Sequence, residues 1–83
     1  MDKESIEEVV ISLLAKTIDD ENSKDTWTAE TDIINDIGID SIQLVRFMLS
    51  VEDELGISLD FDDLDFDDFS SIGALADYLM KNI

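Results

Sequence analysis

Apolar residues recur at helical spacing in three stretches of the chain, and polar segments separate these stretches. In the first stretch they follow the i, i+3, i+4, i+7, i+8 spacing of one helix face, and they are Ile6, Val9, Val10, Leu13 and Leu14. Charged residues lie mostly off this stripe. The pattern predicts one amphipathic helix near the start of the chain.

The second stretch predicts a helix from Ser41 to Leu55, which ends there because Gly56 supplies a stop signal. Its helical repeat comprises Leu44, Val45, Met48, Val51 and Leu55. Three more residues widen the apolar face beyond one packing seam, namely Ile42, Phe47 and Leu49. Some of this wide face is expected to stay accessible or to line an interior cleft, with Phe47 and Met48 in the core.

The third stretch predicts a last helix that begins after a capping serine, Ser70 or Ser71, and ends near residues 81–82. Its periodic residues are Ile72, Leu75, Ala76, Leu79 and Met80.

The segments before the second helix are predicted to be loops and turns. From Thr17 to Thr31 no period survives, which predicts a long surface loop, and Trp27 is expected to anchor that loop to the core. Residues 32–34 predict a short turn. Gly38 then permits a backbone bend just before Ser41, because it has no Cβ.

The segment from Glu52 to Asp68 carries acidic residues and no basic one. Ile57, Leu59 and Phe61 alternate as in a strand, but an isolated strand would have no partner, so a short helix near Asp62 to Asp67 is favoured. Three main helices, one short helix and a long first loop predict an all-α fold. We expect a small antiparallel bundle that forms one domain across residues 1–83.

Charge narrows the possible functions. The 83 residues include 22 acidic and 5 basic side chains, a formal net charge of −17. This surplus disfavours nucleic-acid and anionic-membrane partners and favours proteins with basic surface patches. The chain contains no cysteine and no histidine, which excludes disulfides, the usual zinc sites and imidazole acid–base catalysis.

The sequence shows neither the pattern of a membrane span nor that of a signal peptide. No apolar run approaches the length of a membrane span, and the start Met1-Asp2-Lys3-Glu4 lacks the basic and apolar regions of a signal peptide. A cytoplasmic, monomeric protein is expected.

The aspartates between Asp60 and Asp68 suggest a calcium loop by composition but not by spacing. If the loop began at Asp63, Asp68 would take the glycine position and Ala74 the position of the bidentate glutamate. A solvated acidic face is therefore predicted, with no specific metal site.

Ser41 is the leading candidate for chemistry. A serine at a helix start sits beside unpaired N–H groups and the positive end of the helix dipole, so a phosphate ester would be well accommodated there. The alternative is that Asp40 or Ser41 only caps the helix. Hydrolase chemistry is disfavoured, because no histidine base exists and the glycine of a nucleophile elbow is absent after Ser41. The chain is expected to have no catalytic residue of its own.

The residues around Ser41 resemble the D-x-x-x-D-x-G-x-D-S-L signature of acyl carrier proteins. The matching positions are Asp32, Asp36, Gly38, Asp40 and Ser41, followed by Ile42 in place of leucine. Length, acidity, helix order and the closing segment 69–75 resemble the family as well. The resemblance implies a four-helix carrier in which Ser41 receives 4′-phosphopantetheine from coenzyme A, with Asp40, Gly38 and Ile42 as its surroundings. The resemblance also implies two kinds of partner. A phosphopantetheinyl transferase would attach the group, and acyl-loading and acyl-transferring enzymes would then bind the carrier through basic docking patches.

By family analogy the helix that starts at Ser41 is the docking surface, with Glu52, Asp53 and Glu54 as its acidic groups. Gln43 and Arg46 stand where housekeeping fatty-acid carriers usually have acids, which leaves open fatty-acid, polyketide or another specialised pathway. Asp40 resembles the acyl type, whereas peptidyl carriers more often have histidine at that position, so an aminoacyl cargo is less favoured.

Two further alternatives stay open from the sequence. The residues that could line an acyl-binding cleft are Ile33, Val45, Met48, Ile57 and Leu59, and each is equally well explained as ordinary core. The chain could also be an acidic protein-interaction module without a prosthetic group, in which Ser41 serves only as part of a helix cap.

Overall fold

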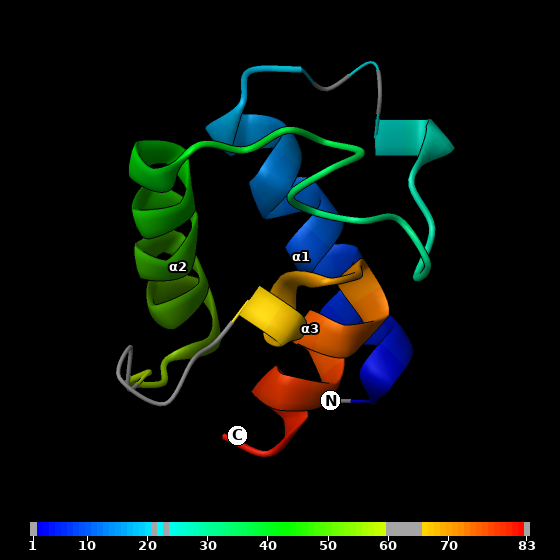
Figure 1. Ribbon diagram of the computed structural model, residues 1–83. Coiled ribbons are helices and arrows are strands. Elements are labelled where there is room, and N and C mark those ends of the chain that lie inside the picture. The colour runs from blue at the N-terminus through cyan, green and yellow to red at the C-terminus, as the bar shows by residue number, and fades with distance from the viewer. Residues whose placement is uncertain (1, 21, 23, 60–65, 83) are drawn as a thin grey trace.

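Three α-helices form the framework of the chain in the computed structural model, which describes residues 2–20, 22, 24–59 and 66–82 (Figure 1). They are α1 (Lys3–Thr17), α2 (Ser41–Leu55) and α3 (Ile72–Met80), and the 3-10 turns η1 (Lys24–Thr26) and η2 (Phe66–Phe69) lie between them. The described residues form helices, turns and loops and no strand. The predicted all-helical fold with three main helices is confirmed.

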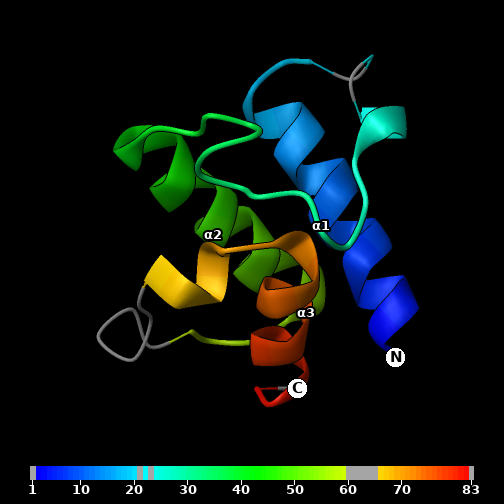
Figure 2. The same ribbon diagram turned by 45° about the vertical axis from the view of Figure 1, so that its right-hand side comes forward.

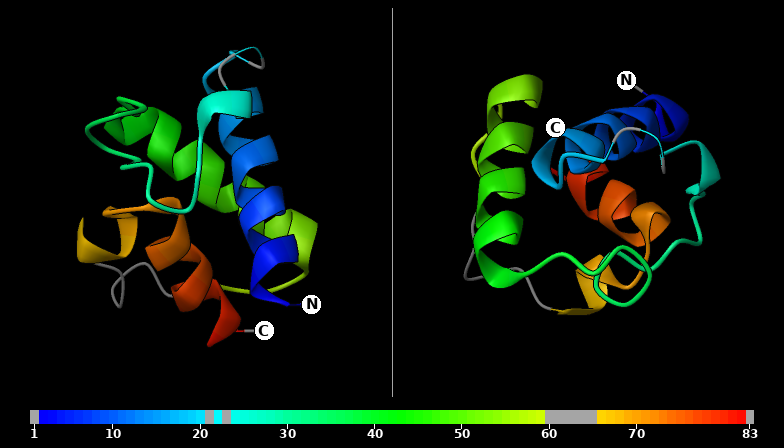
Figure 3. Two further views of the ribbon diagram at one scale, coloured as in Figure 1. Left: turned by 90° about the vertical axis from the view of Figure 1, so that its right-hand side faces the viewer. Right: turned by 90° about the horizontal axis from the view of Figure 1, so that it is seen from above.

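Helix α1 is the central element, because it packs against both α2 and α3. In the left view of Figure 3, α1 rises from the N-terminal end while α2 and α3 descend, so both partners run opposite to α1. Each helix contributes completely buried side chains to one core, among them Ile6, Val10 and Leu14 of α1, Phe47 and Val51 of α2, and Ile72, Leu75 and Leu79 of α3. The apolar stripes therefore meet as their spacing predicts.

Short polar side chains fix the beginnings of α1 and α3. The Asp2 carboxylate accepts the N–H of Ser5 at 2.9 Å. Of the two candidate caps for α3, Ser71 is the one used, since its hydroxyl accepts the N–H of Ala74 at 3.0 Å. These bonds satisfy N–H groups that have no partner within the helix.

The long loop between α1 and α2 crosses the start of α3, as Figure 2 shows. There the N–H groups of Ile72 and Gly73 donate to the carbonyls of Thr31 (3.0 Å) and Ala29 (2.7 Å). Trp27 is half-buried and packs against the core, which confirms the predicted anchor. The loop thus supplies acceptors to the free N-terminal N–H groups of α3 and is held close to the bundle.

The acidic segment before α3 is only partly covered by the structure. The predicted short helix near Asp62 to Asp67 and most of the predicted acidic face fall on residues 60–65, which lie outside the described residues. Within the described part, Phe66–Phe69 forms a 3-10 turn whose Phe69 side chain is buried.

The charge of −17 is expected to make stability depend on salt. Lys3 Nζ and Asp77 form an ion pair at 3.1 Å, but both side chains are exposed, so this pair offsets little of the repulsion between carboxylates. We expect the melting temperature to rise with sodium chloride, and more steeply with magnesium chloride, because both screen carboxylate repulsion. Thermal unfolding followed by circular dichroism measures this, and a melting temperature independent of salt would contradict it.

Candidate functional site

The approach to Ser41 begins with a turn organised by Asp32. Its carboxylate accepts the N–H groups of Ile34 (2.9 Å) and Asn35 (2.8 Å), and the Asn35 side-chain amide donates to it at 2.9 Å. The N–H of Asp32 in turn donates to the Asp36 carboxylate at 2.9 Å. The first two aspartates of the signature therefore build the turn predicted at residues 32–34.

The bonds from Asn35, its backbone N–H most strongly, hold the pKa of Asp32 below its usual value of 3.8, and the Ile34 N–H adds to this. A lowered folded pKa means that the ionised carboxylate is favoured in the folded chain. The stabilisation is complete above the unfolded value and is lost as the pH falls through the lowered folded value.

Gly38 then turns the chain toward α2. Its φ of +78° lies in the left-handed region, which side chains with a Cβ rarely adopt. A Cβ added there would meet no atom within 4 Å, so the requirement for glycine is conformational and not steric crowding. The next residue, Ile39, is buried at 6 % exposure and fixes the chain just before the helix.

Asp40 begins α2 with a complete capping box. Its carboxylate accepts the N–H of Gln43 at 2.8 Å, and the Gln43 side chain accepts the N–H of Asp40 at 3.2 Å. Asp40 is thus the helix cap, and Ser41 is the first residue inside α2. The Asp40 carboxylate is committed to the backbone, which argues against its use as a base for the Ser41 hydroxyl.

Ser41 is exposed and stands where an anion would be stabilised. The N–H groups of Ser41 and Ile42 make no hydrogen bond to another described residue, because the Asp40 carboxylate accepts the N–H of Gln43 and not theirs. The first turn of α2 contains no acidic side chain. Free N–H groups, the positive end of the helix dipole and an accessible hydroxyl together fit a phosphate ester on Ser41.

An exposed apolar stripe begins directly beside Ser41. Ile42 is 69 % exposed, Val45 55 % and Leu49 54 %. In contrast, Phe47 and Met48 are buried, as predicted. Val45 was a candidate for an interior cleft or for the core, and its exposure contradicts both alternatives. It follows Leu44 by about 100° around the helix and so turns away from the core.

The other candidates for an acyl-binding cleft belong to the core or its edge. Ile33, Met48 and Leu59 are buried, and Ile57 packs against them from a partly buried position. A cavity of about 280 Å³ lies nearby, but Asp32, Ile34, Asn35, Phe69 and Ser70 line it. The arrangement of these four residues is that of ordinary core packing.

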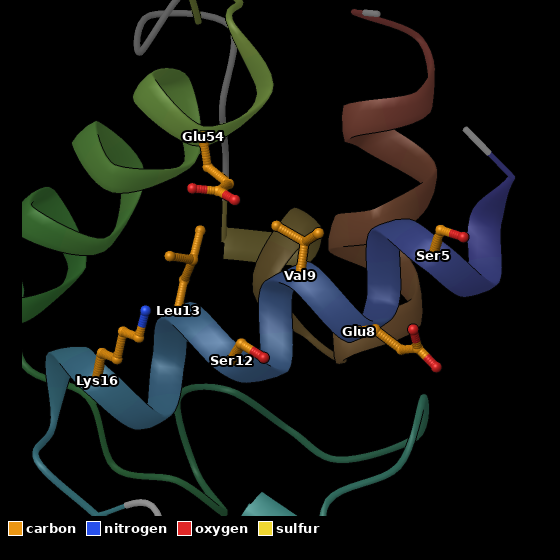
Figure 4. A pocket seen from close by; sticks show the side chains of 7 residues that line it. All are labelled: Ser5, Glu8, Val9, Ser12, Leu13, Lys16 and Glu54. Atoms are coloured by element: carbon orange, nitrogen blue, oxygen red, sulfur yellow. The ribbon is translucent and has the colours of Figure 1, made fainter.

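Four of the five predicted docking residues, Gln43, Arg46, Asp53 and Glu54, lie on one side of α2 at about 100° per residue, and Glu52 lies on the other side. Gln43 is held in the capping box, and Glu52 accepts the N–H of Leu59 at 2.7 Å, which ties the segment after α2 back to the helix. Asp53 is exposed. Glu54 lines a surface groove of about 410 Å³ between α2 and α1, where it extends toward Leu13 (Figure 4).

We expect Asp40→Ala to lower the free energy of unfolding by about 1 kcal/mol, because it removes the cap of α2. Asp40→Asn should retain most of that energy, since its amide oxygen can accept the same N–H. Urea unfolding of the two variants and the unmodified sequence measures the difference. Equal stabilities for Asp40→Ala and Asp40→Asn would contradict the capping role.

The chain matches one protein-family model and is similar in sequence to several known proteins. A family model described as "Phosphopantetheine attachment site" matches residues 8–79, a range that contains the whole of α2. The acyl carrier protein of Lactobacillus acidophilus is 33% identical over 82 residues, which cover 99% of this chain and 98% of that protein. The acyl carrier protein of Thermotoga maritima is 34% identical over 56 residues, 68% of this chain and 67% of that protein. The acyl carrier protein of Clostridium perfringens is 28% identical over 60 residues, 72% of this chain and 76% of that protein.

Proposed function

Because the chain belongs to the acyl carrier protein family, whose prosthetic group is covalently attached 4′-phosphopantetheine, we propose that it holds acyl intermediates as thioesters on that group at Ser41. The observation that carries this proposal is the placement of Ser41. It is the exposed first residue of α2, beside N–H groups that the capping box leaves unbonded.

Several residues around Ser41 determine the position of its hydroxyl. The turn at Asp32 and the bend at Gly38 direct the backbone toward α2, and the capping box fixes the start of that helix at Ser41. The N–H groups of Ser41 and Ile42 then favour negative charge on the Ser41 oxygen substituent. Among the described residues, none forms a hydrogen bond with the Ser41 hydroxyl that could deprotonate it, so activation of Ser41 is assigned to a separate phosphopantetheinyl transferase.

When attached, the prosthetic group supplies a terminal thiol, which this cysteine-free chain lacks and which forms the thioester. The chain itself catalyses nothing and acts by presentation. Tethering raises the effective concentration of the cargo at an enzyme that binds the carrier, so weak and brief docking is sufficient.

The pathway proposed is fatty-acid, polyketide or related biosynthesis in the cytoplasm. Gln43 and Arg46 on α2, in place of acids, support a specialised pathway. Among the described residues, no helix has the length and apolar character to cross a membrane.

Intact-mass measurement with coenzyme A, magnesium and a broad-specificity phosphopantetheinyl transferase tests the proposal. We expect a single phosphopantetheine increment in the folded chain. No increment with several transferases that modify a control carrier would contradict it and favour an acidic protein-interaction module instead.

A further inference from the structure

The outer face of α2 carries an unusual distribution of charge for so acidic a chain. Between Ser41 and Val51 the only charged residue is Arg46, and the acids Glu52, Asp53 and Glu54 follow in the last turn. The part of α2 next to Ser41 is therefore neutral to basic, although the chain as a whole has a net charge of −17.

Arg46 has no acidic neighbour on its own helix. The positions three and four residues away are occupied by Ile42, Gln43, Leu49 and Ser50, none of which is charged. The Arg46 side chain is exposed, and it forms no ion pair with another described residue. No side chain of the described residues competes for its guanidinium, which can therefore pair with a group on another molecule.

Helical geometry places Arg46 within the exposed apolar stripe. At 3.6 residues per turn, Ile42, Arg46, Leu49 and Asp53 share one outer line of α2, and Val45 lies beside it. Because Asp53 follows Arg46 by seven residues, it lies about 10 Å further along the axis. The line therefore runs from an apolar and basic half beside Ser41 to an acidic end.

Building on the proposed carrier function, we propose that this line binds an enzyme surface that places an acidic side chain opposite Arg46. An apolar depression for Ile42, Val45 and Leu49 adjoins that acid, and basic side chains of the enzyme are confined to the part that faces Asp53. Charge complementarity carries the assignment, since a uniformly basic surface would leave Arg46 facing a like charge.

A charge-reversal experiment with a transferase as the probe tests this assignment. The probe is a broad-specificity phosphopantetheinyl transferase with a basic docking surface, and the readout is kcat/KM for modification of Ser41. We expect Arg46→Glu to raise kcat/KM roughly five- to tenfold at low ionic strength, with the gain shrinking as salt is added. The matched control is Lys81→Glu, which changes the net charge equally at an exposed position beyond α3 and should change kcat/KM less than about twofold.

The second part of the experiment reverses charges on the transferase instead of on the carrier. Each basic residue of the transferase docking surface is changed singly to glutamate and assayed with the original chain and with Arg46→Glu. We expect at least one change to raise the rate with the original chain and to lower it with Arg46→Glu.

Three results would overturn the inference: an unchanged rate for Arg46→Glu, an equal gain for Lys81→Glu, or no crossed pair in the second arm. Failure of the proposed function looks different, because then no variant is modified by any transferase. Circular dichroism of each variant confirms that the carrier is folded, which is expected since both replaced side chains are exposed.

Discussion

Ser41→Ala is expected to abolish phosphopantetheine attachment completely. The substitution removes the only oxygen that the proposal makes available for the phosphate ester. It should leave the fold intact, because Ser41 is exposed and its hydroxyl makes no hydrogen bond to another described residue, whereas the cap of α2 is provided by Asp40. Intact-mass spectrometry after incubation with the transferase and coenzyme A measures the loss.

Ser58→Ala is the matched control for that experiment. Ser58 is also exposed and also lies close to α2, but it follows the helix C-terminus instead of opening the N-terminus. It should be modified as fully as the original sequence. Attachment to Ser41→Ala at the original rate would refute the role of Ser41.

The second large effect concerns the helix that presents Ser41. Phe47→Ala is expected to lower the free energy of unfolding by about 3–5 kcal/mol, because Phe47 is completely buried and its removal leaves a cavity. A domain of this size has a total stability of roughly 4–12 kcal/mol, so the variant should be largely unfolded at low salt. Urea unfolding at high and low ionic strength measures the change.

Leu49→Ala is the control, because Leu49 lies on the same helix but is 54 % exposed. Its loss of stability should stay below about 1 kcal/mol. If Phe47→Ala and Leu49→Ala lost equal stability, the division of α2 into a core face and a solvent face would be wrong.

The sequence predicted the helices well because their signals are local. Apolar spacing placed α2 at Ser41 to Leu55, and Gly56 ended it with a φ of +66°, as the structure has it. The signature around Ser41 was equally readable, since Gly38 and Asp40 act within a few residues of the site.

Contacts between distant segments were not predictable in the same way. The Glu52 carboxylate accepts the N–H of Leu59, seven residues later, and no local sequence pattern predicts a hydrogen bond of this kind. The separation of Glu54 from the outer line of α2 depends on how closely α1 packs beside it. Periodicity shows which face of a helix is apolar but not which other element covers it, so Val45 was a candidate for a cleft or the core although it is exposed to solvent.

The most direct test of the central claim is to locate the attached group by peptide mass spectrometry of the modified chain. The account predicts that the phosphopantetheine increment lies on the peptide that contains Ser41, and that fragmentation assigns it to this serine. An increment on any other serine, or a folded chain with no modified peptide after treatment with transferases active on a control carrier, would contradict the account.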